Sequence, residues 1–284
     1  MPKKDQENAH YFRTLIIFLL CIGMGVILYA RFIGTKGLVV KEYVVESPKL
    51  SANFHGLKIV HFSDLHYGST VFIPEVEKIV KEINALKPDI IFFTGDLIDS
   101  SYPIKTDEIT KLTDILNKLK PEIAAYIIKG NHDQTMAYEE ALTKLSFKHL
   151  ANGQELFYYG ENTPLLIIGL DDMFGGHYNL DEAFANLEEN EYYTILLGHE
   201  PDMIDAVLAK DYKVDLFLSG HSHNGQVRLP FVGAIVKAPG AHLYYEAEYQ
   251  LKDTRIFISG GIGTSNYPFR LFNKPSFNLY RFFT

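Results

Sequence analysis

Residues 58–66 read Lys-Ile-Val-His-Phe-Ser-Asp-Leu-His, a short apolar run followed by an aspartate and a histidine. An apolar run of about four to eight residues is typical of a strand that is buried on both faces. Asp64 and His66 come directly after it, separated by one residue. In extended chain, residues i and i+2 point to the same side, so both side chains can face one ligand. The stretch predicts a buried strand with a polar site at its carboxyl end.

Similar apolar runs recur along the chain and alternate with amphipathic stretches. The runs predict further strands at Ile90–Phe93, Ala124–Ile128, Leu165–Leu170, Thr194–Leu197, Leu216–Leu218 and Arg255–Ile258. Apolar residues spaced three and four apart predict helices over Pro74–Leu86, Thr106–Leu119, Leu180–Asn190 and Asp202–Ala209. Alternation of strands and helices indicates an α/β fold.

Four more of the predicted strands end in polar loops. These loops are Thr94-Gly95-Asp96, Gly130-Asn131-His132-Asp133, Gly198-His199-Glu200 and Gly220-His221-Ser222-His223. Ligands in α/β folds bind outside the carboxyl ends of the strands, so we expect the loops to converge on one site. Carboxylate, amide and imidazole groups together suit cations such as Mn²⁺, Fe or Zn²⁺. There are more such groups than one ion needs, which favours two ions that share a carboxylate.

The ordered set Asp-x-His, Gly-Asp, Gly-Asn-His-Asp, Gly-His and Gly-His-x-His resembles the calcineurin-like metallophosphoesterases over about residues 55–265. Two further stretches, GHSHNGQVRLP at 220–230 and GGIGTS at 260–265, resemble the membrane-associated phosphodiesterases of that family. Some relatives there are UDP-2,3-diacylglucosamine hydrolases. The resemblance implies an α/β fold built as a four-layer α-β-β-α sandwich of two mixed sheets.

The resemblance also implies a role for each polar residue. Asp64, His66 and His223 would hold one divalent ion, Asn131, His199 and His221 would hold the other, and Asp96 would bridge the two. Mn²⁺ is the expected metal, with Zn²⁺ or Fe as alternatives. The implied reaction is hydrolysis of a phosphodiester or pyrophosphate bond by attack of a metal-bridging hydroxide.

Four more residues are candidates for a role at the site. His132 adjoins Asn131 and is not needed as a ligand, so we predict that it donates a proton to the leaving group or stabilises the charge that develops there. Asp133 is predicted to orient His132, with a turn cap as the alternative. Arg270 is a candidate phosphate clamp, because a guanidinium fork suits phosphate geometry. Asp99 either supports the site or caps a helix.

The segment 14–30 carries no charge over 17 residues, and Arg13 and Arg31 flank it. As a helix it spans about 25 Å, near the lower limit for crossing a bilayer. We predict a tail over 1–13, an uncleaved transmembrane anchor over 14–33, a linker and edge strand over 34–49, and the catalytic domain over 50–284. A cleaved signal peptide and a buried core helix are the alternatives; Leu28 is not the small residue that cleavage prefers.

The predicted location is a single-pass position in the cell membrane. Basic residues lie in equal number on both sides of the anchor, so the positive-inside rule does not decide its orientation (Lys3, Lys4, Arg13; Arg31, Lys36, Lys41). A short tail before a large domain favours an extracytoplasmic body. The expected partners are this membrane and a phosphate-containing small molecule or lipid.

Charge and composition limit the function. The formal net charge is −8, and residues 55–284 hold 20 basic against 31 acidic side chains. An acidic body argues against nucleic-acid binding, which depends on phosphate neutralisation. The single cysteine excludes a thiolate metal site.

Alternative functions remain open on the motifs alone. They are a UDP-2,3-diacylglucosamine-type pyrophosphatase of lipid A synthesis, a phosphomonoesterase or nuclease of the same fold, and a non-catalytic binding module. A phosphomonoesterase shares the metal motifs, a nuclease is disfavoured by the acidic body, and a binding module is disfavoured because all seven candidate ligands are present.

Overall fold

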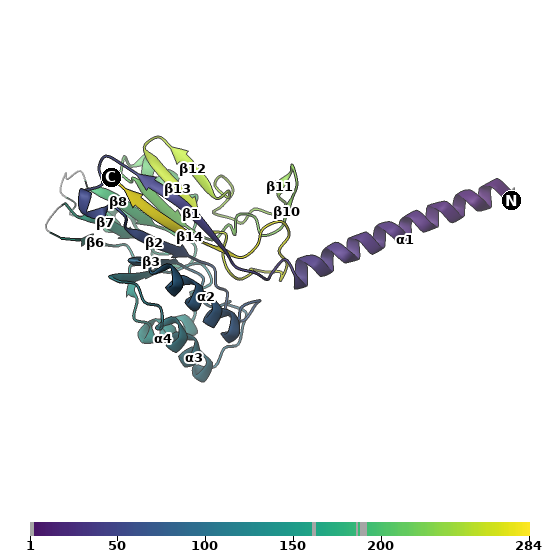
Figure 1. The fold of residues 1–284 in the computed structure, drawn as a ribbon, viewed down its shortest axis with the longest axis horizontal. Helices are drawn as coiled ribbons and strands as arrows, with labels where there is room; N and C mark the ends of the chain where they lie inside the picture. Colours follow the sequence, from purple (N-terminus) through teal and green to yellow (C-terminus); the bar gives the residue numbers. More distant parts are fainter. Residues whose placement is uncertain (1–2, 161–162, 186, 188–191) are drawn as a thin grey trace.

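Two six-stranded sheets form the centre of the body in this computed structural model, which describes residues 3–160, 163–185, 187 and 192–284 (Figure 1). The first sheet has the order β1 (Val39–Glu46), β14 (Ser276–Phe283), β2 (Lys58–Phe62), β3 (Ile90–Thr94), β4 (Ala124–Ile128), β5 (Lys148–His149). β2 to β5 are parallel, β14 is antiparallel to β2, and β1 is parallel to β14. The sheet is therefore mixed.

The second sheet is also mixed. Its order is β12 (Glu248–Leu251), β13 (Thr254–Ile258), β9 (Leu216–Ser219), β8 (Tyr193–Leu197), β7 (Leu165–Gly169), β6 (Gly153–Phe157). The four central strands are parallel, and the edge strands β12 and β6 are antiparallel to their neighbours. All seven strands predicted from apolar runs are present.

Three apolar cores hold the layers together. Side chains such as Phe92 and Leu218 fill the space between the two sheets. The helices α2 (Ile73–Leu86), α3 (Thr106–Leu116) and α4 (Met136–Lys144) cover the outer face of the first sheet (Figure 1). The short helices α5 (Leu180–Ala183) and α6 (Met203–Ala209) pack against the second sheet. The predicted four-layer α-β-β-α sandwich is confirmed.

Some elements differ from the prediction. The helix α4 was not predicted, because its nine residues bury only Tyr138 and Ala141 and so show little apolar periodicity. β14 and the edge strands β6 and β12 were also missed. The helix predicted over 180–190 ends at Ala183, and its residues 186 and 188–190 lie outside the described part of the chain.

The first helix, α1 (Lys3–Phe32), extends away from the body (Figure 1). Residues 8–32 are long and apolar enough to cross a membrane by length and composition, with a mean hydropathy of 2.4 in the most apolar window. The helix begins earlier than the predicted anchor and includes most of the predicted tail. The chain then forms β1, which pairs with β14 over eight residues and so makes the predicted edge strand part of the first sheet.

His61 on β2 is buried between two hydroxyl groups. Its Nδ1 lies 3.1 Å from Tyr280 Oη and its Nε2 lies 2.9 Å from Thr94 Oγ1. Burial lowers the pKa of His61 to about 3. In the unfolded chain this histidine takes up a proton near pH 6.5. In the folded protein the buried ring is still neutral at that pH.

This depressed pKa predicts a loss of stability in mild acid. As the pH falls from about 6.5 towards 3, the unfolded chain takes up a proton that folded His61 does not, so unfolding becomes easier. Between pH 6.5 and 5, we expect His61 to lower the free energy of unfolding by about 2 kcal/mol. Urea unfolding of the metal-free full chain at several pH values measures this. The variant His61→Gln should have a shallower pH dependence, and identical slopes would contradict the prediction.

Candidate metal centre

The carboxyl ends of five strands deliver the predicted ligands to one place. Asp64 and His66 follow β2, Asp96 follows β3, Asn131 follows β4, His199 follows β8, and His221 and His223 follow β9. Six of these side chains form two groups whose potential ligand atoms lie within 4.8 Å of one another: Asp64, His66 and His223; and Asp96, His199 and His221. Loops far apart in sequence thus converge because the parallel strands end on the same side.

Asp96 belongs to the second group and also reaches the first. Its Oδ2 is 3.3 Å from Nε2 of His66 in one group and 3.2 Å from Nε2 of His199 in the other. Asp64 Oδ1 is 3.4 Å from Nε2 of His223. One carboxylate thus reaches both groups, which is the arrangement that a pair of neighbouring cations requires.

The backbone at the site is strained. Five of the predicted ligands have φ in the left-handed region: Asp64 (51°), His66 (41°), Asp96 (61°), His221 (63°) and His223 (49°). Each such residue costs on the order of 1 kcal/mol or more, and such strain gathers at functional sites. Gly95 has φ 91°, and a Cβ there would lie 2.6 Å from Gly130 N and His199 Nδ1. Only glycine allows the two loops to approach so closely.

Hydrogen bonds orient two of the rings. His199 Nδ1–H donates to the carbonyl of Thr94 at 2.6 Å, and His221 Nε2–H donates to that of Pro239 at 2.7 Å. In the neutral form of each ring, this bond leaves the other ring nitrogen with a free lone pair. His199 Nε2 and Asn131 Oδ1 are buried without a hydrogen-bond partner among the described residues. Each is thus a buried atom left available to a cation.

The charges of the site also fit cations. Burial lowers the pKa of His66 and of His221 to about 4, so both rings are neutral at pH 7. Neutral imidazole is the form that binds a metal. Burial raises the pKa of Asp96, but the neighbouring His199 more than reverses this and holds it well below its usual value. The neighbouring Asp96 more than offsets burial and raises the pKa of His199 well above its usual value, so this ring would release a proton on binding a cation. With that release, the residues present fit the divalent ions that the motifs imply.

His132 lies at the edge of this site. Its ring is half-buried and meets the ring of His66 edge-on, with centroids 4.6 Å apart. Its Nδ1 is 3.0 Å from Ser100 Oγ, and its backbone N–H donates to Asp96 Oδ1 at 2.8 Å. Ser100 was not predicted, because a serine in a loop carries no signal without its spatial partner.

A cavity of about 590 Å³ opens over the site. Its floor includes Asp96, Asn131 and His132, and its rim includes Val236 and Tyr267. A substrate in this cavity would contact His132 and the two ligand groups together.

Asp133 has a different position from the predicted one. Its buried carboxylate accepts backbone N–H groups from Asp96 at 2.7 Å, Leu97 at 2.9 Å and Gly130 at 3.0 Å. None of these contacts is to the ring of His132, whose Nδ1 faces Ser100 instead. Asp133 therefore positions the loops after β3 and β4, and its assignment as the group that orients His132 was wrong.

The variant Asp133→Ala should be destabilised. Three buried amides would lose their acceptor, and each costs roughly 1–3 kcal/mol when unsatisfied, so we expect a loss of about 3 kcal/mol or more. Chemical denaturation of the full chain measures it. Asp107→Ala on the exposed surface of α3 is the matched control and should change stability by less than about 0.5 kcal/mol. An Asp133→Ala effect as small as this control would contradict the assigned role.

Arg270 does not reach the cavity. It is fully buried, and its guanidinium donates to the carbonyls of Gly263 (3.0 Å), Gly260 (2.9 Å) and Gly261 (3.1 Å) and to His223 Nδ1 (3.1 Å). The phosphate-clamp prediction was wrong because sequence does not reveal burial. Because Arg270 donates to Nδ1, a neutral His223 carries its proton on Nε2 and must release it before Nε2 can bind a metal, so we expect His223 to bind a metal less strongly than His199.

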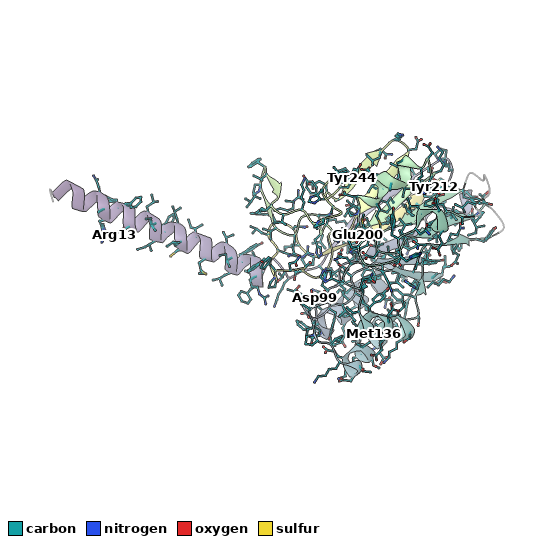
Figure 2. The ribbon with its side chains drawn as sticks, turned by 180° about the vertical axis from the view of Figure 1, so that it is seen from behind. Arg13, Asp99, Met136, Glu200, Tyr212 and Tyr244 are labelled. Atoms are coloured by element: carbon teal, nitrogen blue, oxygen red, sulfur yellow. The ribbon has the colours of Figure 1, made fainter. Side chains whose placement is uncertain are left out.

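Asp99 lies beside the site and does not cap a helix. Its Oδ2 lies 3.7 Å from Nδ1 of His66, while α3 begins further along, at Thr106. Figure 2 labels Asp99 near the end of the body from which α1 leaves, and Glu200 in its interior. At 3.7 Å this is an electrostatic contact and not a hydrogen bond, and His66 Nδ1 has no hydrogen-bond partner among the described residues.

Comparison with known proteins shows the family of the chain. A family model described as calcineurin-like phosphoesterase matches residues 57–225, which is more than half of the chain. The chain belongs to the calcineurin-like phosphoesterase family, and it is a phosphoesterase hydrolase.

Several relatives are similar over most of the chain. The metallophosphoesterase YkuE of Bacillus subtilis is 33% identical over 89% of this chain and 88% of its own length. A zebrafish (Danio rerio) transmembrane protein with a metallophosphoesterase domain is 29% identical over 81% of this chain and 54% of its own. The UDP-2,3-diacylglucosamine pyrophosphatase LpxG of Chlamydia muridarum is 29% identical over 65% of this chain and 68% of its own. A solved dimetal phosphatase from Danio rerio superposes with a TM-score of 0.48 at 12% identity, over 73% of this chain and 88% of that one.

Proposed function

We propose that the chain binds two divalent metal ions and hydrolyses a phosphodiester or pyrophosphate bond in a lipid or cell-envelope substrate. The observation that carries this proposal is the pair of ligand groups that share Asp96 at the floor of the cavity. Asp64, His66 and His223 would hold one ion, and Asn131, His199 and His221 would hold the other. Mn²⁺ is our first choice, with Zn²⁺ or Fe as alternatives, because this ligand set accepts all three.

The bound ions would offset the charge of the phosphate and lower the pKa of a water molecule so that it can attack at neutral pH. A residue of the chain itself would then protonate the leaving group. His132 lies half-exposed at the cavity and can exchange protons with solvent. We assign it proton donation to the departing oxygen, with Ser100 fixing the ring through Nδ1. This leaves Nε2 as the atom that faces the substrate.

The proposal includes a membrane anchor. We propose that α1 is an uncleaved single-pass anchor, that residues 14–33 cross the bilayer, and that the catalytic domain begins after the linker and edge strand. The length and hydropathy of α1 support this, as does the transmembrane relative from zebrafish. We place the body on the extracytoplasmic side, where envelope polymers and lipids are the available substrates.

A second candidate is hydrolysis of a UDP-linked acylated sugar, favoured by the similarity to LpxG. That substrate requires the body to face the cytosol. Protease treatment of intact cells that carry a tag at each terminus separates the two candidates. Digestion of the C-terminal tag from outside supports the envelope substrate, and its protection supports the UDP-linked one.

The reaction class is tested on the full chain in detergent after removal of metal. We expect hydrolysis of a phosphodiester reporter when Mn²⁺, Zn²⁺ or Fe²⁺ is restored, and little hydrolysis of a matched monoester. A preference for the monoester would overturn the diesterase proposal. Two bound ions per chain without turnover of either reporter, or of a lipid-linked pyrophosphate, would favour the non-catalytic module.

A further inference from the structure

One surface hairpin exposes a cluster of apolar side chains to solvent. The strands β10 (Arg228–Leu229) and β11 (Gly233–Ala234) form it, and we call residues 229–236 the apolar hairpin. Phe231 at its tip is fully exposed, and Val232 and Val236 are 71% and 74% exposed. Contiguous exposed apolar surface of this kind marks contact with a membrane or with another protein.

The apolar hairpin is tied to the end of α1 through one short segment. Arg228 N donates to Leu271 O at 3.0 Å, and the adjacent Arg270 N donates to Ala30 O at 2.9 Å. Ala30 lies in the last turn of α1 and is buried. Figure 1 shows β10 and β11 on the side of the body from which α1 leaves. Helix and hairpin therefore face the same side.

The end of α1 is docked closely enough to fix this direction. A Cβ on Gly34 would lie 1.8 Å from the carbonyl oxygen of Arg270, so the backbones are in direct contact there. The chain directly after the helix, like the last turn of α1, is thus held against the body where α1 leaves it. A bilayer that contains α1 would lie on the hairpin's side.

The same surface borders the cavity over the metal centre. Val236 of the apolar hairpin lines the cavity, together with Tyr267, which is 72% exposed. Arg31 and Lys36 follow the apolar part of α1 and add positive charge near this side. Basic residues beside a membrane segment attract anionic lipid headgroups.

We propose that the apolar hairpin inserts into the interface of the bilayer that holds α1, so that the cavity opens onto the membrane surface. Apolar elements of this kind enter about 5–10 Å into the headgroup and acyl boundary. A phosphorylated lipid then reaches the metal centre while its acyl chains stay in the bilayer. This inference rests on the proposed anchor, and it narrows the substrate class to lipids. A bilayer is favoured over a protein partner because the hairpin and α1 face the same side.

The absence of tryptophan from the sequence allows a direct test. The variant Phe231→Trp places a single fluorophore at the tip of the apolar hairpin in the full chain. The protein is reconstituted into phosphatidylcholine and phosphatidylglycerol vesicles with or without bromine on the acyl chains, since bromine quenches tryptophan on contact. Met136→Trp is the exposed control on α4, among the helices that Figure 2 shows on another side of the body. Phe18→Trp within α1 is the control for insertion of the anchor.

We expect brominated lipid to remove most of the fluorescence of Phe231→Trp and Phe18→Trp and to leave Met136→Trp unchanged. Quenching of Phe18→Trp alone would overturn the inference while leaving the anchor intact. If neither is quenched, the anchor and the inference fail together. A blue-shifted but unquenched Phe231→Trp would show that protein covers the hairpin, which also overturns the proposal. None of these outcomes depends on phosphoesterase activity.

Discussion

Replacing Asp96 with alanine should abolish metal-dependent hydrolysis. Its Oδ2 lies 3.3 Å from His66 and 3.2 Å from His199, so both ligand groups lose the carboxylate they share. Metal ions contribute several kcal/mol to the stabilisation of transition-state charge. At about 1.4 kcal/mol per tenfold, kcat should fall by at least about 10³-fold.

The measurement is kcat on a phosphodiester reporter together with the metal content per chain. We expect the Asp96→Ala protein to hold fewer than two ions after dialysis. Asp96→Asn is the matched variant, because it keeps an acceptor for the His132 backbone N–H and removes only the charge. It should lose metal as well. A variant that keeps both ions and full turnover would refute the bridging role.

The variant His132→Ala should keep its metal and turn over slowly. Its ring has a polar contact to Ser100 and borders the cavity, and it is not needed in either ligand group. Loss of a general acid slows turnover by about 10²–10⁴-fold. The expected result is a lower kcat with an unchanged metal content.

Leaving-group dependence separates proton donation from a merely structural role. A nitrophenolate leaves without protonation, so the His132→Ala defect should be small on a nitrophenyl ester and large on an alkyl ester. Ser100→Ala should reproduce the trend more weakly, since it only positions the ring. If His132→Ala lowers kcat equally on both esters, His132 does not act as a general acid. If the variant keeps full activity on both, His132 has no role in the mechanism.

Much of the fold could be predicted from the chain because its signals are local. A strand such as β3 buries all five of its residues, and an uninterrupted apolar run records that burial directly. The helix α2 buries Val76, Ile79, Val80 and Ile83, and this spacing is visible in the sequence. β14 and α4 were missed, the latter because only two of its residues are buried.

For the candidate site, too, the local features could be predicted and the long-range contacts could not. The residue types of the predicted ligands show directly that they can bind a metal. They also follow predicted strands, so the sequence alone was enough to expect their convergence. The partners of these side chains could not be expected, because they lie far away in sequence. Thr94 orients His199 across 105 positions, and Pro239 orients His221 across 18.

The sequence by itself therefore determined the α/β fold and the ligand types, because strand burial and ligand chemistry are visible in short segments, and its motifs determined the family, whose resemblance implied the four layers. Only the tertiary structure decided what Asp133 and Arg270 do, because a buried charge takes whichever donors and acceptors surround it. It also brought the apolar hairpin, the cavity and the end of α1 to one side of the body. Such proximity depends on how separate segments pack, and no single segment carries that information.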